Sequence, residues 1–203
     1  MQLPIDINTI KGFLDPQEGA ALHEHCLATA ALGPCLEVGS YCGKSTVYLG
    51  AAAKKTNSIV YAVDHHRGSE EHQLGEEYHD PDLYDSSAEL MDSFREFRKA
   101  MRAADLENHV VPIVASSTVA ARHWATPLGM VFIDGGHSWE AALNDYRSWV
   151  AHIRQGGILA IHDIFPDPTT GGQAPYDIWK LAKASGLFEE LPMVKTLGLF
   201  RRV

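Results

Sequence analysis

The sequence contains little of what several large protein classes require. Its 203 residues include only three cysteines, and Cys26, Cys35 and Cys42 lack the paired spacing of a disulfide framework or a zinc knuckle. Basic residues are scarce, because 17 lysines and arginines stand against 26 acidic residues and leave a net charge of −9. That balance disfavours nucleic acid or an anionic membrane as partner. No apolar run approaches a membrane span and no signal-peptide pattern begins the chain, so we expect a soluble, cytoplasmic protein.

The composition fits one globular domain over residues 1–203, because 45% of the residues are hydrophobic and no linker or repeat divides the chain. Hydrophobic periodicity predicts helices that alternate with buried strands, which is typical of a parallel sheet with helices on both faces. The predicted helices are 16–31, 45–55, 87–104, 118–124, 139–153 and 176–184, and the predicted strands are 36–38, 58–63, 110–114, 130–133 and 158–161. A very short connection separates two further apolar segments, 188–194 and 196–202. Such a connection can join only antiparallel neighbours, so we expect a hairpin that closes the sheet.

A glycine-containing turn follows the first predicted strand. Residues 36–46 read LEVGSYCGKST, so an apolar run stops at an acid and a glycine before a second glycine opens a helix. This pattern predicts a nucleotide-like ligand at the carboxyl end of the strand. Gly39 and Gly43 enclose three residues where a Walker loop needs four, and Ser40 stands where a dinucleotide fingerprint has its second glycine. A loop with fewer close backbone approaches suits a ligand without phosphates.

Two later strand ends add polar groups to the same predicted crevice. Asp64 follows the second strand about 20 residues beyond the turn, where a carboxylate is placed to accept both ribose hydroxyls of an adenosine cofactor. Ser116 follows the third strand, and it either borders the adenine or caps the helix that starts at Thr118. An adenosine ligand is the common interpretation of these positions.

Acidic residues also end the fourth and fifth strands. Asp134 and Asp163 each follow a buried strand, and adjacent strand ends lie about 4.8 Å apart, so both side chains should reach one crevice. Two carboxylates at such a short distance repel each other unless a proton or a cation lies between them. Magnesium suits such oxygen ligands. A divalent ion lowers the pKa of an alcohol, and His137 is placed to receive the proton. The alternative for His137 is to cap the helix that begins near Ser138.

These residues resemble known methyltransferases. The Glu-x-Gly-x-x-x-Gly pattern at Glu37 resembles the first motif of class I S-adenosylmethionine-dependent methyltransferases. The resemblance implies a Rossmann-like α/β fold, with a mostly parallel seven-stranded sheet, an antiparallel C-terminal hairpin and helices on both faces. It also implies S-adenosylmethionine as cofactor, with contacts from Glu37, Gly39, Ser40, Tyr41, Gly43, Ser45, Asp64, Ser116 and Asp134.

The segment from Ile133 to Ser138 (IDGGHS), together with Asn144-Asp145 and residues 156–163, resembles the metal-dependent sugar O-methyltransferases of the macrocin type and, more distantly, the catechol O-methyltransferases. The likeness covers roughly residues 36–163. It implies that Asp134 and Asp163 bind the metal and that His137 is the general base. Two positions depart from these families: Ile164 replaces the amide ligand of the catechol enzymes, and His162 replaces a carboxylate of the macrocin type. We include His162 as a third metal ligand. Because an imidazole is a softer ligand than Mg²⁺ prefers, the metal is expected to be either Mg²⁺ or Mn²⁺.

The acceptor is predicted from loops and from the same resemblance. Residues 65–86 lack periodicity, as lids and binding loops do, and we expect acceptor contacts from His65, His66, Tyr78 and Tyr84. A second loop, 164–175, is expected to form the opposite wall. The short chain and its Asp-Gly-Gly-His-Ser-Trp sequence resemble methyltransferases that act on methylated mannosides, which implies a sugar hydroxyl as acceptor and a role in polysaccharide biosynthesis.

Two alternatives remain open at this level. The first is a metal-independent methyltransferase acting on nitrogen or sulfur, in which Asp134 binds the cofactor's amino group and Asp163 is structural. The second is an NTP-binding protein that uses Gly43, Lys44 and Ser45. A hydrolase is disfavoured because no Gly-x-Ser-x-Gly elbow is present. The expected partner is a small-molecule or oligosaccharide acceptor, and a homodimer is left open.

Overall fold

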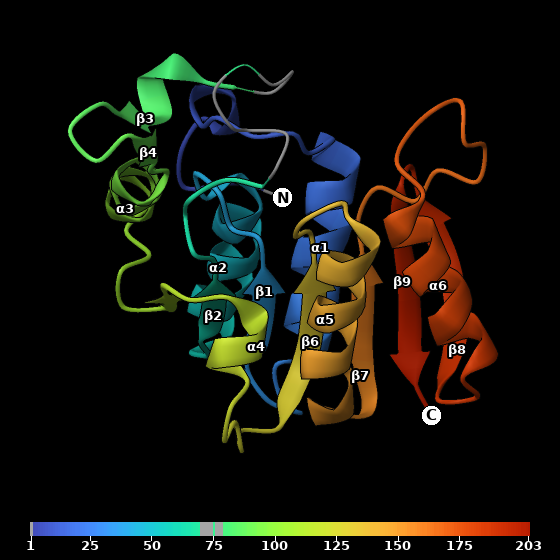
Figure 1. The fold of residues 1–203 in the computed structure, drawn as a ribbon. Coiled ribbons are helices and arrows are strands. Elements are labelled where there is room, and N and C mark those ends of the chain that lie inside the picture. Colours follow the sequence, from blue (N-terminus) through green and yellow to red (C-terminus); the bar gives the residue numbers. More distant parts are fainter. Residues whose placement is uncertain (1, 70–74, 76–78) are drawn as a thin grey trace.

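The computed structural model describes residues 2–69, 75 and 79–203. Its centre is a seven-stranded sheet in the order β5-β2-β1-β6-β7-β9-β8 (Figure 1). The strands β5, β2, β1, β6 and β7 are parallel, whereas β9 runs antiparallel to both β7 and β8. This arrangement confirms the predicted fold. The strands are β1 (Cys35–Val38), β2 (Val60–Val63), β5 (Val110–Ile113), β6 (Leu128–Ile133), β7 (Ile153–Ile161), β8 (Phe188–Val194) and β9 (Leu197–Arg202).

Helices cover both faces of this sheet (Figure 1). On one face lie α1 (Pro16–Thr29), α2 (Lys44–Thr56) and α3 (Phe94–Ala103). On the other lie α4 (Ser117–Ala120), α5 (Trp139–Trp149) and α6 (Ala174–Ala184). Each face therefore has its own hydrophobic core, because strands of a parallel sheet are buried on both sides. Fully buried side chains include Leu22, Leu49 and Phe97 in the first core, and Trp149, Leu159 and Phe200 in the second.

The predicted helix 87–104 is wrong in its first half. The chain forms a short hairpin there, β3 (Tyr84–Asp85) and β4 (Leu90–Met91), and α3 begins only at Phe94. Asp85 accepts hydrogen bonds from the backbone N–H of Ser87 and Ala88, and Asp92 accepts one from Phe94. Short acidic side chains that bond nearby backbone favour turns and helix starts over helix interiors. The hydrophobic periodicity of α3 is real, but the predicted start ignored these caps.

Other helix boundaries move by smaller amounts. The fourth helix ends at Ala120, and α5 gives way after Trp149 to a 3-10 turn, η4 (Val150–His152), before β7 begins. Two further 3-10 turns lie in loops, η1 (Ile7–Thr9) and η3 (Pro81–Leu83). The first helix starts where the sequence predicts, because Asp15 and Glu18 form a reciprocal capping box around Pro16.

Both edge strands contain a proline. Pro112 lies in β5 and Pro192 in β8, where a missing N–H interrupts the row of donors that another strand would pair with.

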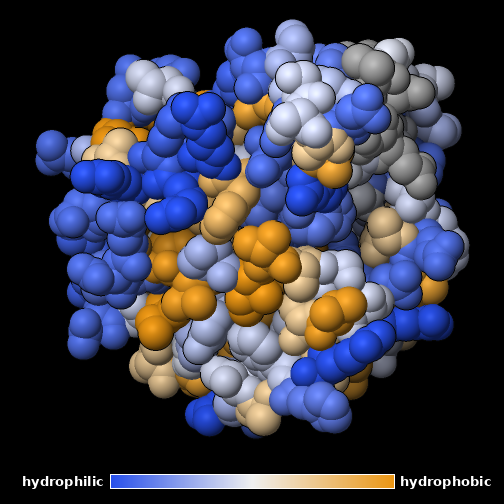
Figure 2. All heavy atoms as spheres, turned by 60° about the vertical axis from the view of Figure 1, so that its left-hand side comes forward, coloured by the Kyte–Doolittle hydropathy of each residue, from blue (hydrophilic) through white to orange (hydrophobic). Residues whose placement is uncertain are grey.

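Figure 2 shows the side of the molecule toward β5 and α4, with apolar surface gathered below its centre. Val111 of β5, Val114 just beyond it and Val119 of α4 are exposed apolar side chains. Within the described ranges, no helix has the length and apolar character needed to cross a membrane.

Four strand ends converge at one edge of the sheet. Because β1 pairs with both β2 and β6, the residues after Val38, Val63 and Ile133 lie side by side, and β7 adds the residues after Ile161. Gly39 is essential to this convergence. Its φ is +83°, and a Cβ at this position would overlap the carbonyl oxygen of Asp134. The glycine therefore allows close approach between two loops of the protein itself, in addition to any approach to a ligand.

We expect Gly39→Ala to lower the free energy of unfolding by at least about 3 kcal/mol, because backbone strain and steric overlap add. Gly186→Ala is the matched control. Its φ is +70° with nothing within 4 Å of an added Cβ, so it should cost only the strain, about 1 kcal/mol. Urea unfolding of both variants measures the difference. Equal losses would show that the overlap at Gly39 relaxes freely.

Candidate active site

Two cavities open at the carboxyl ends of the strands. The first has a volume of about 400 Å³ and extends over β1, β2 and α4. Its polar lining includes Asp64, Ser116, Ser117, Asp134 and Asp145. The predicted cofactor residues Gly39 and Tyr41 also line it. This is the size and position of a ligand pocket in an open α/β sheet.

The second cavity, of about 340 Å³, lies over β7 and the N-terminal segment. Its lining includes the apolar residues Phe13, Phe165 and Pro175 and polar groups such as Lys11 and Thr170. As the sequence predicts, the loop 164–175 forms part of this wall. Lys11 pairs with Asp80 and Asp82 at 2.6 and 2.9 Å, which ties the N-terminal segment to the loop before β3.

The two cavities share a wall. Its residues are Gly39, Tyr41, Ser69, Asp134, Gly135 and His137. A ligand in the first cavity can therefore meet a ligand in the second beside Asp134 and His137. Such a junction is the geometry that transfer of a group between two bound molecules requires.

The glycine loop is stabilised from below by a buried acid. Glu37 is fully buried, and the hydroxyls of Ser45 and Thr46 both donate to its carboxylate. Burial raises the pKa of Glu37 to about 8, with Asp134 and Asp64 adding to the rise against these two hydrogen bonds. Of the predicted cofactor residues, Ser40 and Ser45 line the second cavity, whereas Glu37 and Gly43 line neither cavity. Glu37 can therefore affect cofactor binding only indirectly, by holding the glycine loop in place through Ser45 and Thr46.

Lys44 and Ser45 are engaged away from any phosphate position. The Lys44 Nζ donates to the carbonyl oxygen of Gly12 at 2.9 Å, and the Ser45 hydroxyl is held by Glu37. A Walker loop directs its lysine at phosphates and its serine at magnesium. The NTP-binding alternative is thus not favoured, in agreement with the short spacing between Gly39 and Gly43.

Asp64 is held rigidly at the end of β2. Its Oδ2 accepts the backbone N–H of Tyr41 at 2.8 Å, and its Oδ1 accepts that of His66 at 2.7 Å. Both donors have left-handed backbone, with φ of 45° at Tyr41 and 59° at His66. Ser116 occupies the N-cap position of α4, but its side chain makes no capping hydrogen bond, and its hydroxyl lies 3.3 Å from that of Thr118. Ser116 thus combines the two positions that the sequence left open, at a helix start and in the cavity lining.

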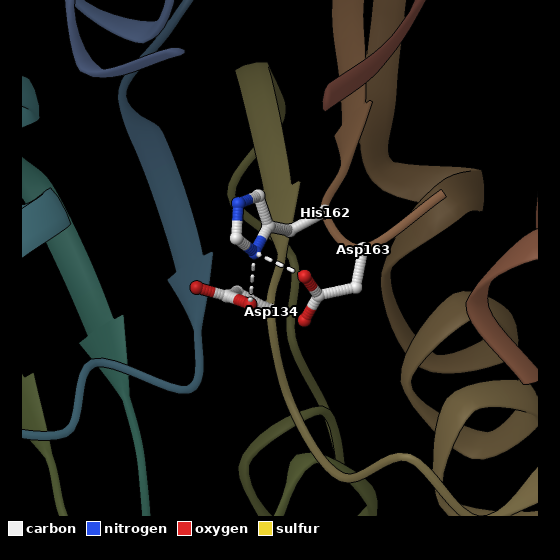
Figure 3. A group of neighbouring side chains, drawn as sticks. All are labelled: Asp134, His162 and Asp163. Carbon is white, nitrogen blue, oxygen red and sulfur yellow. Dashed lines mark hydrogen bonds and ion pairs between the residues drawn. The ribbon is translucent and has the colours of Figure 1, made fainter. Parts of the chain in front are cut away.

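Asp134, His162 and Asp163 form one cluster, as Figure 3 shows. The Nδ1 of His162 lies 3.0 Å from Asp134 Oδ1 and 3.3 Å from Asp163 Oδ1. The convergence of the two acids from β6 and β7 is therefore as the sequence predicts. Neighbouring side chains of a strand point to opposite faces, yet His162 and Asp163 both reach Asp134. A φ of 58° at Asp163 turns its side chain back, and such backbone strain is common at functional sites.

Sequence reasoning missed the residue that holds His162 from behind. Glu18 of α1 is 2% exposed, and its Oε2 lies 3.0 Å from His162 Nε2. Its Oε1 accepts the backbone N–H and the hydroxyl of Thr196, in the turn between β8 and β9. The capping pattern at Asp15 and Glu18 is visible in the sequence, but it explains a helix start and gives no sign of contact with β7.

The charges of this cluster shift the pKa values of its members. Burial alone would lower the pKa of His162, but the charge of Asp134 and hydrogen bonds with Asp134, Asp163 and Glu18 raise it well above its usual range. Burial would raise the pKa of Asp163, yet hydrogen bonds from His137 and His162 hold it well below the ordinary value. The pKa of Glu18 is likewise lowered by His162 and Thr196 against its burial. The crevice therefore holds stable negative charge that attracts a positive partner.

His137 lies at the junction of the cavities. Its Nε2 is 3.0 Å from Asp163 Oδ2, and its side chain is 36% exposed. The N-cap of α5 is Ser138, whose hydroxyl accepts the N–H of Ala141 at 3.4 Å. Helix capping by His137, the alternative left open above, is therefore wrong. The ring is positioned by a carboxylate and remains accessible from both cavities.

The predicted acceptor residues are dispersed. His65 lines the first cavity. His66 is buried, with its Nδ1 2.8 Å from the Ser93 hydroxyl and its ring against Phe94 and Phe97, so an acceptor contact from His66 is not supported. Tyr84 packs on the first core and against the ring of His79, outside both cavities. Tyr78 lies outside the described residues.

Asp145 is a second residue that sequence reasoning left without a role. Asp145 is 8% exposed, and a Cβ at Gly135 would overlap its carboxylate. Burial raises its pKa to about 6, with Asp64 adding to the rise against a hydrogen bond from Ser117. The glycine at 135 is thus explained by room for this carboxylate. Asp145 contributes an acceptor group to the lining of the first cavity.

The family model described as "Methyltransferase domain" matches residues 36–164, which include the glycine loop, Asp64, Asp134, His137 and Asp163. The chain belongs to this methyltransferase family. The match includes the lining of the first cavity and the wall shared with the second, and it assigns the enzyme class. Phe13, Phe165 and other residues of the second cavity lie outside it. Glu18 and Thr196 lie outside the matched segment.

Solved methyltransferases share the fold. The O-methyltransferase NovP superposes with a TM-score of 0.70 at 15% identity, covering 92% of this chain and 80% of that one. An O-methyltransferase from Bacillus cereus in complex with SAH superposes with a TM-score of 0.65 at 15% identity, covering 96% of this chain and 86% of that one. The SAH-bound methyltransferase PaMTH1 from Podospora anserina superposes with a TM-score of 0.66 at 13% identity, covering 94% of this chain and 80% of that one. At these identities the likeness establishes the methyltransferase fold.

The cluster at β6 and β7 also fits a divalent cation. Octahedral coordination with bonds of ~2.1 Å places adjacent ligand atoms about 3 Å apart. The ligand atoms of Asp134, His162 and Asp163 lie within 4.8 Å of one another, and the two distances from Nδ1 match that spacing. Two carboxylate oxygens and one imidazole nitrogen suit Mn²⁺ at least as well as Mg²⁺. The donor set and its spacing therefore agree with the metal site that the sequence predicts.

The raised pKa of Glu37 predicts a pH-dependent stability. The folded-state pKa of about 8 exceeds the ordinary value of 4.5, so the folded methyltransferase binds this proton more tightly than the unfolded chain. The stabilisation is complete below pH 4.5 and is lost as the pH rises to 8, by at most about 5 kcal/mol. In Glu37→Gln this loss should be absent, as urea unfolding across that range measures. A constant difference between the two proteins would mean that Glu37 titrates normally.

Proposed function

We propose that this methyltransferase transfers the methyl group of S-adenosylmethionine to a hydroxyl group, with the assistance of a divalent cation. The observation that carries the proposal is the junction of two cavities beside Asp134 and His137. SAH, the demethylated product of this cofactor, is bound in PaMTH1 and in the Bacillus cereus enzyme, which share the fold. The first cavity suits the cofactor because Asp64 stands about 20 residues beyond the glycine loop, where it accepts ribose hydroxyls.

The second cavity suits the acceptor. Phe13 and Phe165 offer apolar surface for the carbon face of a sugar ring, while Lys11 and Thr170 offer polar groups for its hydroxyls. This mixed lining, together with the resemblance of residues 133–138 to sugar O-methyltransferases, supports a sugar hydroxyl as acceptor, in particular that of a mannoside. Mannoside methylation would place the enzyme in polysaccharide biosynthesis.

The metal would be held by Asp134, Asp163 and Nδ1 of His162. Bound there, a divalent cation supplies positive charge that makes a nearby hydroxyl more acidic. His137 then receives the proton of the acceptor hydroxyl as general base. Asp163 Oδ2, 3.0 Å from His137 Nε2, orients the ring and stabilises the imidazolium that results. The acceptor oxygen forms its bond to the methyl carbon as the carbon–sulfur bond breaks, which yields a methyl ether, SAH and one proton.

Chelation tests the role of the metal. EDTA should reduce methyl transfer to hydroxylated acceptors by at least about 100-fold, and added Mn²⁺ or Mg²⁺ should restore it, because charge stabilisation contributes several kcal/mol. Asp163→Asn, which tolerates the left-handed backbone, should require more metal for half-maximal rate. Assays with labelled S-adenosylmethionine and a panel of mannosides and catechols measure both effects. Full activity in EDTA would favour a metal-independent transferase.

Substitution of His137 tests the general base. His137→Ala should lower kcat by about 100- to 10,000-fold, because the proton of the acceptor has lost its recipient. Affinity for SAH, measured by calorimetry, should stay within about twofold. His137→Gln is the control, since its amide still donates to Asp163 but accepts no proton near neutral pH. If the glutamine variant recovers the rate, His137 orients Asp163 and another group is the base.

A further inference from the structure

Glu18 is a buried carboxylate that the proposed reaction does not use. It comes from α1, and its two oxygens contact different parts of the fold. Oε1 accepts the N–H and the hydroxyl of Thr196 at 2.8 and 2.7 Å, which fixes the carboxylate in one orientation. Oε2 lies 3.0 Å from His162 Nε2. Because burying an unpaired charge costs much free energy, a buried carboxylate with this many hydrogen-bond partners indicates that its contact with His162 has a specific role.

The Glu18 contact decides which nitrogen of His162 carries a proton. An ionised carboxylate only accepts hydrogen bonds, so the Nε2 atom that faces Oε2 must be protonated. In a neutral imidazole the lone pair then lies on Nδ1. That atom faces Asp134 and Asp163 at 3.0 and 3.3 Å. The same ring can therefore serve as a metal ligand only through the nitrogen that points into the crevice.

We propose that Glu18 is a positioning residue that holds the Nε2–H of His162 and thereby presents Nδ1, with Asp134 and Asp163, to a divalent cation. The inference rests on the proposed metal dependence and adds a residue outside the segment that the family model matches. Histidine ligands commonly donate their second N–H to a carboxylate, which fixes the ring and increases its basicity. Thr196 completes the arrangement by holding Glu18 from the opposite side.

The experiment measures metal affinity without turnover. Mn²⁺ binding to the full-length protein, free of cofactor and acceptor, is followed by electron paramagnetic resonance or calorimetry. In Glu18→Gln one end of the amide faces the two Thr196 donors, and the other faces Nε2 and the backbone N–H of Asp15, so no orientation pairs all four donors as the carboxylate does. The neutral amide therefore holds the Nε2–H less firmly, and where its N–H₂ faces Nε2 it favours the tautomer with its proton on Nδ1, which cannot bind metal. We expect Mn²⁺ affinity to fall by about 10- to 100-fold.

Two variants control for helix damage and misfolding. Asp15→Ala removes the other half of the same capping box and does not contact His162, so it should leave Mn²⁺ affinity within about twofold. Thr196→Val removes one of the two donors to Glu18 and is the milder variant, with an expected loss of about threefold or more. If Glu18→Gln fails to fold, Thr196→Val carries the test.

A double-mutant cycle separates positioning from general stability. The side chain in His162→Asp is too short to reach Glu18, so adding Glu18→Gln to that variant should change Mn²⁺ affinity by less than about twofold. Unchanged affinity in both Glu18→Gln and Thr196→Val would overturn the inference while the metal site stands. An equal loss with histidine or aspartate at position 162 would also overturn it. Failure of the unmodified protein to bind Mn²⁺ would instead reject the proposed metal dependence.

Discussion

The site is governed by negative charge gathered around one imidazole. Asp134, Asp163 and Glu18 surround His162 from three directions, and each lies within 3.3 Å of a ring nitrogen. Carboxylates that lie so close together in a partly buried crevice remain ionised only if positive charge lies among them. In the protein alone the protonated ring supplies it, and the pKa of His162 is raised accordingly. A divalent cation at Nδ1 would supply the same charge, so the protein is prepared for a cation by its own electrostatics.

The parallel sheet explains why these groups meet. Each helix returns the chain to the start of the next strand, so β1, β2, β6 and β7 all end at the same edge. Polar loops at that edge line two cavities, and His137 lies on their shared wall. Left-handed backbone at Tyr41, His66 and Asp163 indicates that the loops are held against their local preference. The strain is sustained by the rigid core on both faces of the sheet.

The N-terminal helix adds a constraint from outside the matched methyltransferase segment. Through Glu18, α1 contacts both the end of β7 and the turn between β8 and β9. Ile164, directly after Asp163, donates its N–H to the Thr196 carbonyl, so the same turn also fixes the chain beyond the site. The antiparallel hairpin thereby supports the crevice as well as closing the sheet.

The sequence by itself determined the fold class, the strand ends and the pairing of Asp134 with Asp163. Those features follow from local periodicity and from the rule that parallel strands end at one edge, and both are visible along the chain. Only the tertiary structure decided the partners of His162, the burial of His66, the packing of Tyr84 and the part taken by Glu18. Glu18 and His162 are 144 residues apart, and their contact depends on how α1 packs against the sheet. No local pattern encodes that packing, because a capping glutamate looks the same whether its side chain faces solvent or a buried histidine.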